Sequence, residues 1–114
     1  FLLRRVVPAL AQRRGFVAQV SAVVAEQPLP GMAAYAASKA ALTAADKALT
    51  RELRRCGVDV IDIRPPHTET GLAGRPLAGT APPLPQGLDP DAVARQILDA
   101  VESGRPELAS TDFA

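Results

Sequence analysis

The stretch from residue 15 to residue 42 reads GFVAQVSAVVAEQPLPGMAAYAASKAAL, and it predicts a strand, a loop and a helix in that order. Residues 16–20 form a short apolar run of the kind found in buried strands. Residues 25–31 carry two prolines and a glycine, which predict an irregular loop. The sequence over 33–55 is rich in alanine and favours a long helix, which Gly57 is placed to end.

The flanking segments continue the alternation of helices and strands. Asp89 and Pro90 form a typical helix start, with an N-cap side chain followed by proline in the first turn. The order predicts an α/β fold with right-handed parallel crossovers, whose ligands bind beyond the carboxyl ends of the strands. The predicted elements are a helix over 1–14, a strand over 16–20, a helix over 33–55, a strand over 58–63, a loop over 64–88, a helix from 90 to about 104 and a short strand over 106–111.

Length, charge and cysteine content exclude several classes of protein. With 114 residues and a net charge of +1, the chain is one domain over 1–114 and gives no reason to expect a nucleic acid or an anionic membrane as partner. No apolar run approaches the roughly 20 residues of a membrane span. The only cysteine, Cys56, cannot form an internal disulfide and favours a cytoplasmic protein. A single histidine and a single cysteine argue against a zinc site, so no metal site is predicted.

Tyr35 and Lys39 are the residues that most resemble catalytic machinery. Residues four apart project from the same side of a helix. A free tyrosine has a pKa of roughly 10, and a nearby positive charge favours the phenolate that can take a proton from an alcohol. The pair therefore indicates proton transfer between an alcohol and a carbonyl group. The alternative is a solvated lysine beside a half-buried tyrosine on an alanine-rich helix.

A second stretch, IRPPHTETGL at 63–72, supports this interpretation. Together with GFVAQVSA, the Pro-Gly loop and YAASKAAL, it closely resembles the short-chain dehydrogenase/reductase family. Pro65, Thr70 and Leu72 stand where that family usually carries the Pro, Thr and Met of the loop after its next strand. The resemblance implies the carboxyl-terminal half of a Rossmann-like doubly wound parallel sheet, as a single partial domain.

The resemblance also implies a reaction and a site. The family transfers hydride reversibly between NAD or NADP and a small-molecule alcohol/carbonyl pair. On the matching positions, Tyr35 is the catalytic acid/base, while Lys39 binds the nicotinamide ribose and favours the phenolate. The 64–88 loop contains the substrate lid, and its leucines, alanines and prolines favour an apolar substrate. The candidate cofactor-binding residues are Tyr35, Lys39, Pro65, Thr68 and Thr70.

Several departures from the family pattern bear on activity. Ala22 stands where the family's catalytic serine usually lies, and Ser21 precedes it. Adjacent strand residues face opposite sides, so Ser21 is either a displaced catalytic hydroxyl or a structural serine at a strand end. Pro66 replaces a glycine and removes a backbone donor. The glycine-rich turn for dinucleotide phosphates does not occur in the sequence, and neither does the family's Asn-Ala-Gly stretch, as expected of a truncated member.

These departures predict that the 114 residues alone bind NAD(P) weakly or not at all and are inactive by themselves. The resemblance implies a homo-oligomer formed through the helices over 1–14 and 33–55. Two alternatives to the enzyme are a noncatalytic dimerisation or assembly module and a decayed relic. The remaining polar residues of the long helix are interpreted as an ordinary solvated face without function: Asp46, Lys47, Arg51, Glu52, Arg54 and Arg55.

Overall fold

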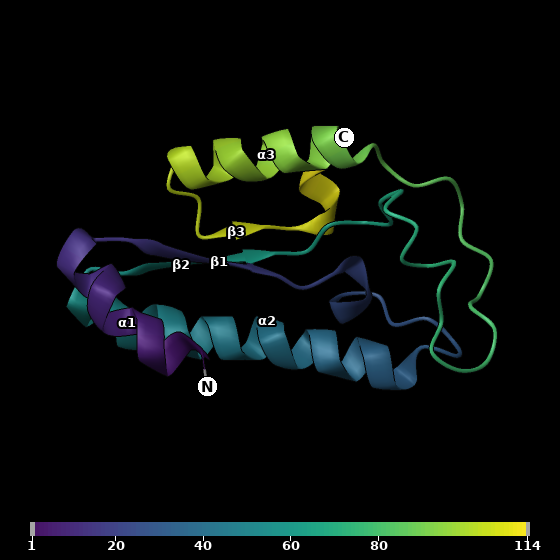
Figure 1. Cartoon of the computed structure of the whole chain (residues 1–114), viewed down its shortest axis with the longest axis horizontal. Helices are drawn as coiled ribbons and strands as arrows, with labels where there is room; N and C mark the ends of the chain where they lie inside the picture. Colours follow the sequence, from purple (N-terminus) through teal and green to yellow (C-terminus); the bar gives the residue numbers. More distant parts are fainter. Residues whose placement is uncertain (1, 114) are drawn as a thin grey trace.

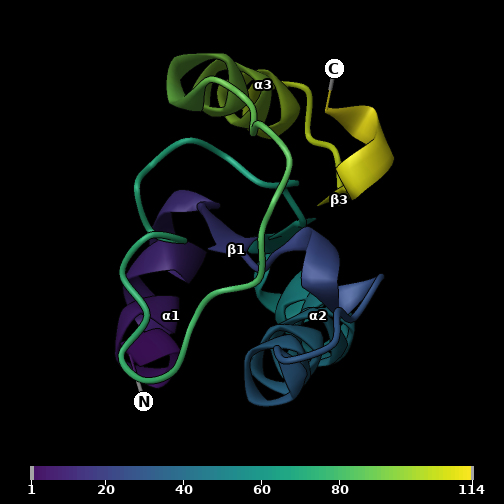
Figure 2. The ribbon, with the colours of Figure 1, turned by 90° about the vertical axis from the view of Figure 1, so that its right-hand side faces the viewer.

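A computed structural model describes residues 2–113 and has three layers, with helices on both faces of one sheet (Figure 1). The helices are α1 (Leu2–Arg13), α2 (Ala33–Leu53) and α3 (Pro90–Glu102). The strands are β1 (Phe16–Val20), β2 (Asp59–Ile63) and β3 (Glu107–Leu108). In both views α1 and α2 lie on one face of the sheet and α3 lies on the other (Figure 2). The predicted α/β class with a doubly wound sheet is confirmed.

The sheet has the strand order β1-β2-β3, and both neighbouring pairs are parallel. Phe16 lies opposite Asp59 and Val20 lies opposite Ile63, so β1 and β2 pair along their whole length. The outer edge of β1 has no partner strand within residues 2–113. Phe16 and Val20 remain 49% and 48% exposed, and no residue of β1 belongs to the cluster that packs against α3.

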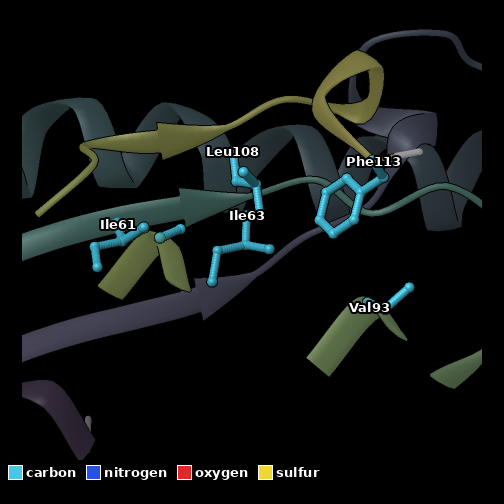
Figure 3. Packing of buried hydrophobic residues seen from close by; sticks show 6 residues of the cluster. Ile61, Ile63, Val93, Leu108 and Phe113 are labelled. Carbon is cyan, nitrogen blue, oxygen red and sulfur yellow. The ribbon is translucent and has the colours of Figure 1, made fainter. Parts of the chain in front are cut away.

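Side chains alternate along β2 and separate the two faces of the sheet. Ile61 and Ile63 point toward α3 and pack with Leu108 of β3 and with Phe113, as Figure 3 shows. Burial of this apolar surface gives the face its stability. The buried members of the cluster are Ile61, Ile63, Val93, Ala100, Leu108 and Phe113.

The opposite face packs against α1 and α2. Val58 and Val60 are buried there together with Leu53 at the end of α2, and Leu10 of α1 packs against them. Gly15 joins α1 to β1 where a Cβ atom would lie 2.9 Å from the Leu10 side chain. A larger residue at this junction would therefore require the Leu10 side chain to shift.

The helix ends follow the predictions. The Asp89 carboxylate accepts a hydrogen bond from Ala92 N at 2.9 Å, and Pro90 lies in the first turn of α3. A 3-10 turn at Arg54–Cys56 follows α2, and Gly57 then adopts a left-handed φ of 69°. Cys56 is exposed in this turn.

Two predictions were wrong. The strand predicted over 106–111 is only two residues long, because a 3-10 turn at Ser110–Asp112 follows β3 and Asp112 accepts a hydrogen bond from Ala109 N at 2.8 Å. Asp46 does not lie on a solvated face, since it is 1% exposed and points to the sheet. The other polar residues assigned to that face are exposed.

Candidate active site

Four polar side chains of α2 line one side of the helix, and three of them contact β1 or the residues that follow it. Lys39 Nζ donates to the Val20 carbonyl at 3.2 Å, at the carboxyl end of β1. Deeper in the molecule, Gln19 Nε2 donates to Asp46 Oδ1 at 2.8 Å. The spacing i, i+4, i+8 and i+11 places on one side of a helix the residues Tyr35, Lys39, Thr43 and Asp46.

The Tyr35 phenol and the Lys39 ammonium lie together, as their spacing predicts. Lys39 Nζ is 5.7 Å from the centre of the Tyr35 ring. Tyr35 is 37% exposed, so its ring is accessible from solvent at the edge of the sheet where ligands of this fold class bind. An ammonium has three donors, and the contact with Val20 uses one of them. The remaining donors are available to a ligand.

Ser21 faces the interior. It is 3% exposed, and its Oγ donates to the Ile63 carbonyl at 3.3 Å and to Asp62 Oδ1 at 3.4 Å. The same atom lies 3.2 Å from Thr43 Oγ1. All of these partners belong to the packed layer between the sheet and α2. The structure therefore brings Ser21 together with Thr43 and Asp62, and within residues 2–113 this hydroxyl forms no hydrogen bond with Tyr35.

The segment after β2 runs beside the end of β1. Val23 N donates to the Pro65 carbonyl at 2.9 Å, which brings the two chain segments together at the carboxyl edge of the sheet. Thr68 Oγ1 donates to the Pro66 carbonyl at 3.0 Å, and Thr70 is exposed. In the described part of the chain neither threonine hydrogen bonds to Tyr35 or Lys39. These candidate cofactor contacts thus share an edge with the pair without touching it.

Arg64 forms a buried ion-pair network that sequence reasoning missed. Its guanidinium bonds to the carboxylates of Asp62, Glu26 and Glu107, the last at 3.0 Å. Burial alone would lower the pKa of Arg64, but the bonds to Glu26, Glu107 and Asp62 raise it above its usual value. For Glu26, burial alone would raise the pKa, but hydrogen bonds from Ser110 and Arg64 lower it. The network ties the turn after β1 to β2 and β3.

Asp46 carries a carboxylate in the same interior layer. Burial and the charge of Asp62 raise the pKa of Asp46 to about 6, although the hydrogen bond from Gln19 acts to lower it. Asp46 Oδ2 has no hydrogen-bond partner among residues 2–113. The sequence feature that could have revealed this buried carboxylate is Gln19, because glutamine is unusual in a short buried strand.

Other kinds of site are not found in the described residues. Over 2–113 no helix has the length and apolar character needed to cross a membrane. Within the same range, no cluster of three histidine, cysteine, aspartate or glutamate residues is arranged to hold a metal ion. A cavity of about 250 Å³ lies at α3 and β3, away from Tyr35, and its lining includes Gln96, Asp99, Ser103 and Arg105.

Comparisons with known proteins agree with this fold. A family model described as short chain dehydrogenase matches residues 1–78. Dehydrogenase/reductase SDR family member 7B of Rattus norvegicus is 28% identical over 120 aligned positions, which cover 98% of this chain and 37% of that protein. The chain thus spans less than half of this relative.

Two solved structures share the fold. One is a short-chain dehydrogenase from Sphingobium yanoikuyae in complex with NADPH, with a TM-score of 0.78 and 30% identity, covering 96% of this chain and 42% of that one. The other is a short-chain dehydrogenase from Burkholderia cenocepacia J2315 in complex with NADP, with a TM-score of 0.81 and 27% identity, covering 96% and 43%. Because the family model matches more than half of its residues, this chain belongs to the short-chain dehydrogenase/reductase family.

Proposed function

We propose that this chain carries the proton-transfer site of an NAD(P)-dependent oxidoreductase that interconverts an alcohol and a ketone or aldehyde. The observation that carries the proposal is the Tyr35 ring with Lys39 Nζ 5.7 Å from its centre, at the carboxyl edge of the sheet in a chain of this family. A bound nicotinamide cofactor supplies or accepts the hydride. The chain's own contribution is the proton.

Each residue of the pair has a separate role in this proposal. The Tyr35 hydroxyl gives its proton to the carbonyl oxygen during reduction and takes it back during oxidation. Lys39 places a positive charge 5.7 Å from the centre of the Tyr35 ring. Lys39 also fits a ribose, because its ammonium has donors left after the contact with the Val20 carbonyl. This donor set supports NAD or NADP as the cofactor.

Cofactor binding by these 114 residues is proposed to be weak. Pro65, Thr68 and Thr70 are candidate contacts of the nicotinamide end, but Pro66 offers no backbone donor there. The sequence has no glycine-rich turn to hold the dinucleotide phosphates. Calorimetric titration of the purified chain with NAD and NADP tests this, and a Kd in the low micromolar range would contradict it.

We assign Ser21 a structural role rather than a catalytic one. Its buried hydroxyl already bonds to Asp62 and to the Ile63 carbonyl, which supports this assignment. Ala22 offers no hydroxyl, so the proposed site lacks a serine donor. Loss of one such donor costs on the order of a hundredfold in rate, so the proposed enzyme is slow. The exposed Leu72 and Leu77 of the lid favour an apolar substrate.

The proposed function is tested in a polypeptide that joins these residues to the amino-terminal segment of the family fold. Tyr35→Phe is expected to lower kcat for oxidation of apolar secondary alcohols by about 10²–10⁴-fold. Ser21→Ala is the matched control and is expected to leave kcat unchanged within about twofold, because a structural serine does not touch the substrate. A Tyr35→Phe variant that keeps the parent rate would overturn the proposal.

One observation favours a second candidate, a noncatalytic assembly module. α1 has no buried residue, and Leu2 is 76% exposed on it. A second copy that packs on α1 and α2 would cover such side chains. Sedimentation of the purified chain separates the candidates, since a defined dimer without any cofactor binding favours the assembly module.

A further inference from the structure

The two ends of the 64–88 loop lie side by side. Thr68 and Leu88 form an isolated parallel bridge. Leu88 N donates to the His67 carbonyl at 2.8 Å, and Glu69 N donates to the Leu88 carbonyl at 3.0 Å. In Figure 1 the loop extends beyond the carboxyl ends of the strands, descends to the height of α2 and returns to α3. A short ladder therefore closes the loop at its base.

The Glu69 carboxylate adds a side-chain link to this ladder. Glu69 Oε1 accepts a hydrogen bond from Gly87 N at 2.6 Å and lies 3.4 Å from His67 Nε2. A hydrogen bond to an ionised acceptor is stronger than one between neutral groups. One oxygen thus joins both ends of the loop. We call His67, Glu69, Gly87 and Leu88 the clasp.

At Gly87 the two segments of the clasp lie too close together for a side chain. A Cβ atom on Gly87 would lie 2.7 Å from both the His67 carbonyl oxygen and its Cδ2. Backbone atoms cannot give way as a flexible side chain would. A glycine is therefore required here by the close approach, and any larger residue separates the two strands.

The part of the loop between the clasp residues is held much less. Over 71–86, the hydrogen bonds are Arg75 N to the Leu72 carbonyl and Arg75 Nε to the Gly71 carbonyl, both within the segment. Leu72 and Leu77 are exposed. A segment with few tertiary bonds and exposed apolar side chains opens at low free-energy cost.

We propose that Glu69 is a positioning residue: through the clasp it holds Thr68 and Thr70 in place at the carboxyl edge of the sheet, while residues 71–86 move as the lid. The inference rests on the proposed function and divides the 64–88 loop into a fixed cofactor-contact part and a mobile part. The moving part is bounded by the clasp and begins at Gly71, which has a left-handed φ of 76°.

Amide hydrogen exchange of the purified chain tests the clasp without any cofactor. The amides of Glu69, Gly87 and Leu88 are expected to exchange at least about tenfold more slowly than that of Gly74 in the lid. Gly87→Ala is expected to remove the protection of Glu69 and Leu88. Gly74→Ala is the matched control, because a Cβ there meets only the Gly71 carbonyl at 3.7 Å and should change nothing.

Any of three exchange results overturns the clasp. In the wild type, the clasp amides would exchange as fast as the lid amides. In Gly87→Ala, the Glu69 and Leu88 amides would stay protected, or in Glu69→Ala the Gly87 amide would exchange no faster than in the wild type. Loss of protection at Arg64 N, which donates to the Leu108 carbonyl in the sheet, would show that Gly87→Ala unfolds the chain. In that case the Glu69→Ala result decides whether the clasp exists.

Binding of NADP at millimolar concentration, followed by NMR at the Lys39 and Thr70 amides, tests the positioning role. Glu69→Ala is expected to raise the Kd by about three- to tenfold, and Glu69→Gln, which keeps the Oε1 acceptor, is expected to restore it within about twofold. Equal Kd values for Glu69→Ala and wild type overturn the positioning role. If the wild-type chain shows no shifts, the same comparison is made in the polypeptide joined to the amino-terminal segment, where equal Kd values overturn the positioning role. The Tyr35→Phe result decides the proposed function separately, and the exchange results decide the clasp.

Discussion

The two faces of β2 differ in chemistry near the carboxyl end of the strand. Toward α3, the buried cluster around Ile61 and Ile63 has no polar side chain. Toward α2 and the turn after β1, Asp62 accepts hydrogen bonds from Ser21, Thr43 and Arg64. Apolar groups need only to be covered, whereas each buried polar atom needs a partner. The α3 face is therefore held by apolar packing, while the carboxyl end of the other face also depends on buried charges.

The largest effect is expected from breaking the polar face at Arg64. Arg64→Ala leaves Asp62 buried without its cation, which is expected to cost about 3–5 kcal/mol in the free energy of unfolding. Urea denaturation at neutral pH measures this loss. Arg95→Ala, at an exposed position on α3 with no ion pair in the described residues, is the control and should cost less than about 0.5 kcal/mol. Equal losses in the two variants would show that the network contributes little.

Asp46→Asn is expected to act in the opposite direction and to stabilise the chain at pH 8 by about 1–2 kcal/mol. The pKa of Asp46 rises from 3.8 to about 6 on folding, so the folded state binds the proton more tightly than the unfolded state. The contribution of Asp46 to stability is therefore complete below pH 3.8 and is lost as the pH rises through 6.

Urea denaturation at pH 4.5 and pH 8 checks this sign. Wild type should lose stability between the two values, and Asp46→Asn should lose much less. Glu26 and Asp112 have lowered pKa values, so their contributions to stability are lost as the pH falls below their usual values of 4.5 and 3.8, at or under the lower end of this window. If Asp46→Asn lost as much stability between the two pH values as wild type does, the pH dependence could not be assigned to Asp46.

The smallest effect is expected on the apolar face. Ile63→Val removes one methyl group from a fully buried side chain and should cost about 1 kcal/mol. No ionisable side chain belongs to that cluster, so the cost should be the same at pH 4.5 and pH 8. A cost that changes with pH would show that the two faces are coupled.

The fold was predictable because its signals are local. Gly15 and Gly57, the prolines of the loops and the Asp89 cap mark the ends of elements within a few residues. The Tyr35 and Lys39 pair was equally local, since helical spacing alone places both side chains on one side. Because adjacent residues of a strand face opposite sides, the sequence already offered a structural serine at the strand end as one of two roles for Ser21.

The polar interior was not predictable in the same way. α2 is so rich in alanine that its sequence hardly distinguishes the buried side from the solvated one, so Asp46 was placed with the exposed arginines. Continuing the spacing from Tyr35 and Lys39 would have placed it correctly. The partners of Arg64 come from three different segments of the chain, and no local pattern connects Glu26 with Glu107.

Cys56 lies in the turn that follows α2, at the opposite end of the helix from Tyr35. No other thiol occurs in the sequence. At a rise of 1.5 Å per residue, the two positions are separated by about 30 Å. A maleimide dye attached to Cys56 would therefore sit well outside the reaction site and label the molecule at one defined point. Energy transfer from a reduced nicotinamide to such a dye would report docking as a distance, without altering Tyr35 or Lys39.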